Sequence, residues 1–182
     1  MRILAERELI HSIENYSVTI VVGETGSGKT TKIPQFLYEC GFASPCIALS
    51  LPRRVSVLSV AQRIASNLHS YVGTLVGYSI RFDHNCSPEQ TRVKVLTDGM
   101  LVRETLADPL LSRYSVIMVD DCHERSLYTD TLLGLLKKIR RRRRDLRVVV
   151  SSATLEAENL KQFFEDEEPP SQALGGIVFQ RT

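Results

Sequence analysis

The 182-residue sequence predicts an α/β fold in three layers, with helices on both faces of a mainly parallel sheet. Two observations favour this class. Short runs rich in β-branched residues recur along the chain, and segments with helical periodicity lie between them. Strands that alternate with helices are typical of parallel sheets with right-handed crossovers. Because ligands of such sheets bind beyond the carboxyl ends of the strands, the segments that follow each strand are the candidate sites.

The elements are expected in a regular order. An amphipathic helix should occupy the first 16 residues, where Ile3, Leu9, Ile10 and Ile13 are the apolar positions. Strands are expected at Val18–Val22, Cys46–Leu51, Val93–Thr97, Val116–Asp120 and Val148–Ser152. Helices are expected from about 55 to 68 and around Leu132–Ile139, where apolar residues recur three and four positions apart. Beyond a domain of residues 1–165, the acidic and then Pro- and Gly-rich residues 166–182 are expected to form a poorly ordered tail.

The composition is that of an ordinary globular protein, with 43% hydrophobic and 24% charged residues. No apolar run approaches the roughly 18 residues of a membrane span, so no membrane association is expected. The cysteines and histidines show no metal-ligand spacing. The net charge of +2 conceals two charged blocks, because residues 137–147 hold eight basic side chains and one acid, whereas residues 156–168 hold six acids and one lysine. The basic block is either the end of a helix or a weak, salt-sensitive nucleic-acid site.

A phosphate-binding loop is the strongest motif. Gly23-Glu24-Thr25-Gly26-Ser27-Gly28-Lys29-Thr30, followed by Thr31, matches GxxxxGK[ST] between a predicted strand and a helical segment. The glycines let backbone N–H groups approach phosphate oxygens. Lys29 supplies positive charge at the β- and γ-phosphates, Thr30 supplies a hydroxyl for Mg²⁺, and the helix N-terminus adds its dipole.

A second candidate group follows the strand Val116–Val119. Asp120 is the expected ligand of Mg²⁺ through water, because Mg²⁺ keeps several waters when it binds to proteins. Asp121 is placed to hold the metal and to orient or deprotonate an attacking water. On its own, this acidic pair could equally cap a following helix; the phosphate-binding loop makes the catalytic interpretation the stronger one.

Five short segments together resemble the motifs of DEAH-box RNA helicases, in the same order and at the same spacing. They are GETGSGKT, Arg53-Arg54 in LSLPRR, Thr97-Asp98-Gly99, DDCH, and Ser152-Ala153-Thr154. The resemblance spans residues 8–165 and implies a RecA-like P-loop NTPase fold that uses ATP and Mg²⁺. The connecting segments resemble a spliceosome-associated member of the family. This implies single-stranded RNA and spliceosomal proteins as partners, and the nucleus as the location, with the cytoplasm as the alternative.

The resemblance also implies roles for single residues. Arg63 would stack on the adenine of ATP, a contact that suits a planar guanidinium. His123 would link the γ-phosphate to RNA binding, and Ser152, Ala153 and Thr154 would couple the nucleotide state to that binding. The expected contacts with the RNA backbone are Arg53, Arg54, Thr97, Asp98 and Gly99, which would fix the protein on the strand without reading its sequence.

Two features depart from the family pattern. Asp121 stands where the family has glutamate, and the missing methylene withdraws the carboxylate by roughly 1 Å, which can lower a rate on the order of 100-fold. Cys122 replaces an alanine, with no chemical role expected. The resemblance also fades near Glu165, so the second RecA-like domain of the family, with its arginine fingers, is expected to be absent from these 182 residues.

Two classes of function therefore remain open. The chain is either the ATP-binding half of an RNA helicase or a catalytically weak module that binds nucleotide, RNA or protein. A P-loop kinase or GTPase is disfavoured, because the ordered helicase motifs are present and a guanine-specific NKxD element is not.

Overall fold

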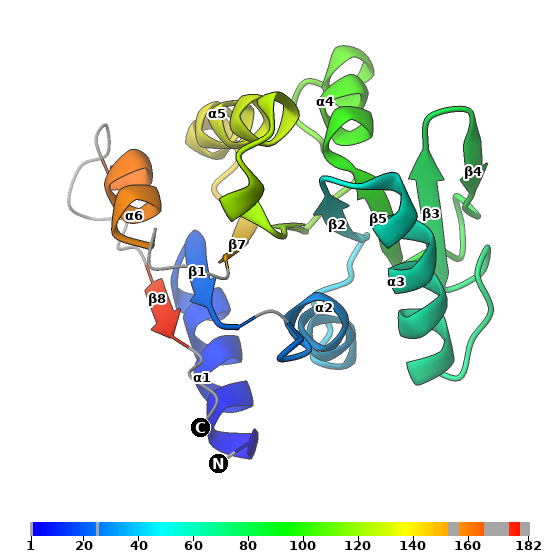
Figure 1. The fold of residues 1–182 in the computed structure, drawn as a ribbon, viewed down its shortest axis with the longest axis horizontal. Helices are drawn as coiled ribbons and strands as arrows, with labels where there is room; N and C mark the ends of the chain where they lie inside the picture. The colour runs from blue at the N-terminus through cyan, green and yellow to red at the C-terminus, as the bar shows by residue number, and fades with distance from the viewer. Residues whose placement is uncertain (1, 25, 153–156, 166–174, 179–182) are drawn as a thin grey trace.

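An eight-stranded sheet with helices on both of its faces forms the described part of the chain (Figure 1). The computed structural model describes residues 2–24, 26–152, 157–165 and 175–178. The strands are β1 (Val18–Val22), β2 (Ile47–Leu51), β3 (Val76–Ile80), β4 (Asp83–Asn85), β5 (Val93–Thr97), β6 (Val116–Val119), β7 (Arg147–Ser152) and β8 (Gly175–Val178). The helices are α1 (Arg2–Asn15), α2 (Lys29–Glu39), α3 (Arg54–Asn67), α4 (Asp98–Ala107), α5 (Leu127–Arg142) and α6 (Ala157–Glu165), with a 3₁₀ turn η1 (Cys122–Glu124).

The sheet is mainly parallel, which confirms the predicted fold class. Its order is β4-β3-β5-β2-β6-β7-β1-β8, and β4 alone runs antiparallel to its neighbour. All five strands expected from the sequence are present. The hairpin β3–β4 was not expected, because its strands are short and mix apolar with polar and glycine residues.

Residues 175–178 depart from the expected tail. They form β8, which pairs in parallel with β1 over Thr19–Val22. The predicted poorly ordered tail is therefore wrong for these four residues, because backbone hydrogen bonds to the open edge of β1 place them in the sheet. The other residues of the expected tail lie outside the described ranges.

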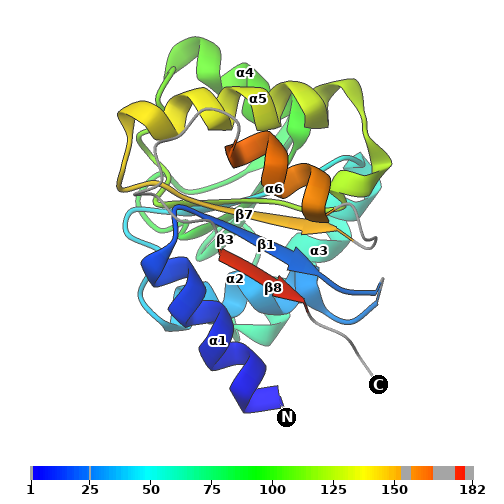
Figure 2. The same cartoon turned by 90° about the vertical axis from the view of Figure 1, so that its left-hand side faces the viewer.

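Two cores fill the space between the sheet and its helices. Helices α1, α2 and α3 cover one face, and α4, α5 and α6 cover the other (Figure 2). The strands are buried on both faces, which explains their nearly continuous apolar sequences. In α1, Leu9 and Ile13 are buried against the first face, and in α5 the predicted stripe of Leu132, Leu136 and Ile139 is buried against the second. None of the described helices has the length and apolar character needed to cross a membrane.

A largely buried ion pair joins the sheet to α4; the side chain of Lys94 is 11% exposed and that of Glu104 is 26% exposed. Lys94 is on β5, and its ammonium lies 2.7 Å from Oε1 of Glu104 on α4. The hydroxyl of Tyr114, a residue 1% exposed, donates to the other carboxylate oxygen at 2.6 Å. Burial beside this carboxylate raises the pKa of Tyr114, so the hydroxyl stays protonated. The three side chains satisfy one another in an otherwise apolar layer.

Removal of the Glu104 carboxylate should therefore destabilise the fold strongly. We expect Glu104→Leu to lower the free energy of unfolding in urea by about 3 kcal/mol, because it leaves the Lys94 charge buried and unpaired. Lys94→Met combined with Glu104→Leu should recover most of this loss. The control is Asp130→Ala, which breaks the more exposed pair with Arg125 and should cost less than about 1 kcal/mol. Equal losses in Glu104→Leu and Asp130→Ala would contradict the structural role of the buried pair.

Candidate nucleotide-binding site

The phosphate-binding loop turns the chain from β1 into α2. Gly26 and Gly28 have φ values of 83° and 90°, in the left-handed region where glycine is least strained. The loop is fixed to the neighbouring strand, because the N–H of Gly23 donates to the carbonyl of Ser152 at 3.1 Å. Lys29, Thr30 and the preceding N-cap Gly28 thus lie at the start of α2, where phosphate oxygens find free N–H groups. Thr25 lies outside the described residues.

Lys29 bridges the loop. Its ammonium donates to the carbonyls of Gly23 and Glu24, the second at 2.7 Å, and lies 3.4 Å from the hydroxyl of Ser27. Burial lowers the pKa of Lys29, whereas the nearby charges of Asp120 and Asp121 raise it. The charges of the acidic pair after β6 therefore act on the ammonium of Lys29.

Asp120 is fully buried at the end of β6. Its backbone N–H donates to the carbonyl of Ser50 on β2 at 3.0 Å, which fixes the residue between two strands. Its Oδ1 accepts hydrogen bonds from the N–H of Asp121, at 2.9 Å, and from the hydroxyl of Ser151. Its Oδ2 is buried and accepts no hydrogen bond from the described residues. Burial raises the pKa of Asp120 to about 6, while the side chain of Thr30 lowers it.

The oxygen atoms of Asp120 and Thr30 are suitable ligands for a magnesium ion. The unpartnered Oδ2 of Asp120 is the kind of hard oxygen that Mg²⁺ prefers, directly or through water. The influence of Thr30 on the pKa of Asp120 shows that its side chain faces the same carboxylate. Among the described residues, no group of three or more His, Cys, Asp or Glu side chains is clustered for metal binding, so a metal here would depend on phosphate and water for its remaining ligands.

Asp121 has an unusual backbone. Its φ of 52° and ψ of 36° lie in the left-handed region, where aspartate is found more often than most residues that have a side chain. Its charge raises the pKa of both Lys29 and Asp120, which places its carboxylate in the same electrostatic environment. The sequence predicted a shortened reach at this position; the backbone shows that a short acidic side chain also suits the turn.

Ser151 is a site residue that the sequence reasoning missed. Its hydroxyl donates to Asp120, so the end of β7 contacts the candidate metal ligand directly. The expected coupling residue Ser152 is next in the chain and 1% exposed, and its carbonyl receives the N–H of Gly23. The two adjacent serines, Ser151 and Ser152, at the end of the predicted strand were the sequence feature that could have identified Ser151 as a site residue. Ala153 and Thr154 lie outside the described residues.

The expected RNA contacts do not all face outward. Asp98 is 1% exposed, and its carboxylate accepts hydrogen bonds from Ser50 and Thr129. The Asp98 carboxylate therefore points into the fold, and a contact of the turn Thr97–Gly99 with RNA stays a prediction. Thr97 is 9% exposed at the N-cap of α4, and Gly99 is half-buried against the ring of Tyr128.

The two arginines after β2 have different surroundings. Arg53 forms a two-point ion pair with Glu124 of η1, at 2.7 and 3.1 Å. Arg54 donates to the carbonyl of Arg81 at 3.2 Å, so it lies beside the β3–β4 turn. In that turn the guanidinium of Arg81 lies 4.8 Å from the centre of the Phe82 ring, and Phe82 is 88% exposed. Sequence reasoning missed Arg81 and Phe82, although an adjacent basic and aromatic pair was a usable signal.

Arg63 and His123 remain predictions. Arg63 is exposed on α3, which packs beside α2, the helix that follows the phosphate-binding loop. His123 is half-buried in η1, directly after the acidic pair. Their positions are compatible with adenine stacking and with coupling to the γ-phosphate, and both roles stay predictions.

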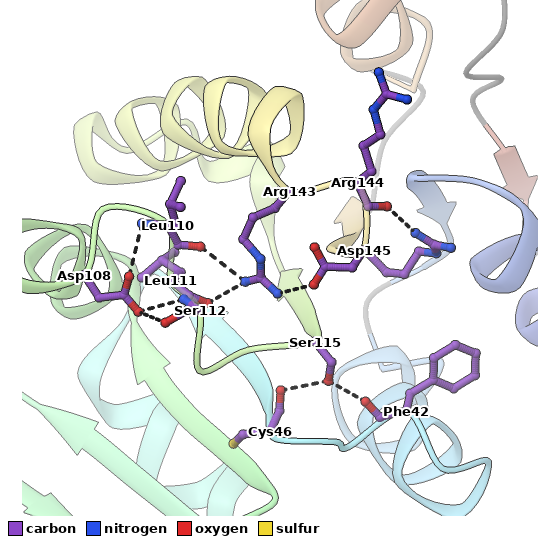
Figure 3. A network of polar contacts seen from close by, with 11 residues as sticks. Phe42, Cys46, Asp108, Leu110, Leu111, Ser112, Ser115, Arg143, Arg144 and Asp145 are labelled. Carbon is purple, nitrogen blue, oxygen red and sulfur yellow. Dashed lines mark hydrogen bonds and ion pairs between the residues drawn. The ribbon is translucent and has the colours of Figure 1, made fainter.

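The basic block is the C-terminal end of α5 and the turn that follows. Arg140, Arg141 and Arg142 form the last turn of the helix, where cations favour the dipole, so the helix-end interpretation is confirmed. Arg143 donates to the carbonyls of Leu110 and Leu111 and pairs with Asp145 at 2.6 Å (Figure 3). Arg144 is exposed, and its carbonyl accepts a hydrogen bond from the side chain of Arg147. The block lies near the start of β7, at the opposite end of the sheet from Asp120.

A sequence model of the DEAD/DEAH box helicase family matches residues 5–163. The chain belongs to this family. A Schizosaccharomyces pombe protein named as a pre-mRNA-splicing factor ATP-dependent RNA helicase, C20H4.09, is 48% identical over 94% of this chain and 27% of its own length. The human protein named as an ATP-dependent RNA helicase, DHX35, is 50% identical over 93% of the chain and 24% of its own length. A Caenorhabditis elegans homologue of DHX35 is 54% identical over 86% of the chain and 22% of its own length.

The DEAD/DEAH box helicase chain described here thus spans about a quarter of the length of the curated relatives that it matches. The matched residues 5–163 include the phosphate-binding loop, the acidic pair and the strand end with Ser151. Nucleotide use and RNA binding are properties of the family.

The raised pKa of Asp120 leads to a testable pH dependence. The group releases its proton near pH 3.8 in the unfolded chain and near pH 6 in the folded one, so the folded chain binds more protons between these values. The free energy of unfolding therefore decreases as the pH rises through this window. Asp120→Asn removes the titration. In EDTA and without nucleotide, the stability of this variant relative to wild type should rise by about 2 kcal/mol from pH 4 to pH 7 in urea denaturation.

Asp108→Asn is the control for the direction in which the stability difference changes with pH. Hydrogen bonds from Ser112 lower the pKa of Asp108, so the stability of Asp108→Asn relative to wild type should instead fall as the pH rises. A flat difference for Asp120→Asn, or one with the sign of Asp108→Asn, would show that Asp120 is not buried as an uncompensated carboxylate.

Proposed function

We propose that this chain is the ATP-binding, first RecA-like domain of an ATP-dependent RNA helicase that acts in pre-mRNA splicing. The observation that supports it most strongly is the buried, unpartnered carboxylate oxygen of Asp120 at the end of β6, together with Lys29 of the phosphate-binding loop, whose pKa the charges of Asp120 and Asp121 raise. The names of the relatives point to RNA and to splicing. The nucleus is the corresponding location, with the cytoplasm as the alternative, and spliceosomal proteins are the corresponding partners.

In this proposal the residues of the loop bind the phosphates of ATP. Backbone N–H groups at Gly26–Thr30 and the ammonium of Lys29 would neutralise the β- and γ-phosphate oxygens. Bound Mg²⁺, held by Thr30 and Asp120, would neutralise charge on the same oxygens. Asp121 would orient the attacking water and accept its proton, while Ser151 keeps the carboxylate of Asp120 in place. A second RecA-like domain would complete the site with positive charge on the opposite side of the γ-phosphate.

The RNA-binding surface in this proposal lies beside the same edge of the sheet. Arg54 and Arg81 supply positive charge, and the exposed ring of Phe82 supplies a stacking surface for a base. Thr97, Gly99 and Arg53 would complete the backbone contacts. Such contacts are largely independent of base sequence, as a helicase that moves along RNA requires.

A second candidate function is a nucleotide- and RNA-binding module with weak hydrolysis. The observation that favours it is Asp121 itself, whose side chain is one methylene shorter than the glutamate of the family and whose own backbone lies in the left-handed region. Both functions share the binding site and differ in the rate of the chemical step, so hydrolysis separates them.

The decisive measurement is RNA-stimulated ATP hydrolysis by four proteins. These are the 182-residue chain, its Asp121→Glu variant, and longer versions of both with a second RecA-like domain. We expect little turnover from the two shorter proteins. Of the two longer ones, Asp121→Glu should have the higher kcat, on the order of 100-fold if the shortened reach limits the step.

Lys29→Ala is the binding control and should abolish nucleotide affinity in all four proteins. Rapid hydrolysis by the 182-residue chain alone would contradict the need for a second domain. Unchanged nucleotide affinity in Lys29→Ala would contradict the assignment of the phosphate-binding loop.

The RNA surface is tested by salt dependence. We expect Arg54→Ala to weaken binding of single-stranded RNA of any sequence, and to reduce the slope of log affinity against log salt by about 0.7, the value for one lost phosphate contact. Arg144→Ala is the matched control, because it removes an exposed arginine of the basic block near the start of β7. A larger effect of Arg144→Ala would instead place the principal RNA site on the basic block.

A further inference from the structure

The carboxylate of Asp98 connects three segments of the fold. Asp98 is the first residue of α4, and both of its oxygens accept hydrogen bonds from hydroxyl groups. Oδ1 accepts from Ser50 on β2 at 2.5 Å, and Oδ2 accepts from Thr129 in the first turn of α5 at 2.5 Å. All three residues are at most 1% exposed. One buried side chain therefore joins the end of β2, the start of α4 and the start of α5.

Each of these segments leads directly to a candidate site residue. The carbonyl of Ser50 receives the N–H of Asp120, so the residue that binds Asp98 also positions the candidate metal ligand. Ser50 is also three residues before Arg53. Gly99, the neighbour of Asp98, packs against the ring of Tyr128, the neighbour of Thr129. The RNA-facing turn and the segment after the acidic pair thus meet at this carboxylate.

The start of α5, which contains Thr129, is also fixed by hydrogen bonds. The hydroxyl of Ser126 accepts the N–H of Thr129 at 3.0 Å and caps α5, and it lies 2.6 Å from the hydroxyl of Thr129. One residue, Arg125, separates Ser126 from η1, the turn that contains His123 and Glu124. Displacement of η1 would therefore be transmitted through Ser126 and Thr129 to Asp98.

A buried carboxylate at position 98 has a desolvation cost that an apolar side chain would avoid. Burial raises the pKa of Asp98, and no hydrogen bond or ion pair in the described part of the chain gives it a cationic partner. An apolar side chain of similar size would avoid the desolvation cost, but it could not fix two hydroxyl groups in defined directions. Directional hydrogen bonds between separate segments are what a coupling element requires.

We propose that Asp98 is a positioning residue that couples nucleotide binding to RNA binding. This inference rests on the proposed function, because it assumes that ATP binds at Lys29 and Asp120 and that RNA binds beside Arg54 and Gly99. Through Ser50 and Thr129, Asp98 keeps the RNA-facing turn in a fixed relation to the acidic segment. A nucleotide that displaces Asp120–Glu124 then changes the affinity for RNA, and RNA changes the affinity for nucleotide by the same factor.

The test measures this factor in the 182-residue chain. The affinity for a fluorescent single-stranded RNA is determined with and without a saturating, non-hydrolysable ATP analogue and Mg²⁺. We expect a factor on the order of 10 for the wild type. Thr129→Val keeps the shape of the side chain but removes the donor to Asp98, and should reduce the factor to below about 2. Thr129→Ser keeps the donor and should retain the factor of the wild type.

Asp98→Ala removes both hydrogen bonds and should also lose the coupling. In Thr129→Val the separate affinities for RNA and for nucleotide should stay within about 3-fold of wild type, because Thr129 contacts neither ligand. If Asp98→Ala fails to fold, the Thr129 pair still decides the question. Asp108→Asn, an exposed change at the other end of α4, is the control for effects of the helix alone.

Three outcomes would overturn the inference. They are full coupling in Thr129→Val, equal loss of coupling in Thr129→Ser and Thr129→Val, and binding of both ligands by the wild type without coupling. A wild-type chain that binds neither ligand would instead contradict the proposed function. The two failures are therefore distinguishable.

Discussion

Parallel strands in one sheet end at the same edge, and this constraint brings together everything that the candidate site contains. The phosphate-binding loop follows β1, Arg53 and Arg54 follow β2, the turn at Thr97 follows β5, and Asp120 follows β6. Segments separated by up to about 130 residues in the sequence therefore meet without any special long-range contact. The hydrogen bonds from Ser151 to Asp120 and from Gly23 to Ser152 then fix the relative positions of three strand ends.

Two buried carboxylates, Asp120 and Asp98, are suited to different roles in this structure. Asp120 and Asp98 are both buried, and burial raises the pKa of both. Asp120 retains an oxygen with no hydrogen bond from the described residues, which suits an incoming cation. Asp98 has both oxygens occupied by hydroxyl groups, which suits a fixed joint. The number of satisfied oxygens, rather than the charge, separates a ligand from a structural connection.

Local sequence was sufficient for the parts of the site that depend on local chemistry. Five of the eight described strands, and the helices α1, α3 and α5, followed from the pattern of apolar residues, and the phosphate-binding loop followed from glycine spacing. Asp98 could not be judged in this way, because its burial depends on Ser50 and Thr129, which are 48 and 31 residues away. Ser151 lies one residue before the expected motif, and which serine faces Asp120 depends on the direction of alternate side chains in β7. The strand β8 was missed because its partner is at the other end of the sequence.

The position of β1 in the sheet has a consequence for the order of assembly. Residues 18–22 pair only with β7 at residues 148–152 and with β8 at residues 175–178. During synthesis the strand that leads into the phosphate-binding loop therefore has no sheet partner until most of the domain has left the ribosome. Contacts between residues so far apart in the chain form slowly, since a long loop must close first. The ability to bind nucleotide should consequently be among the last properties that the nascent chain acquires.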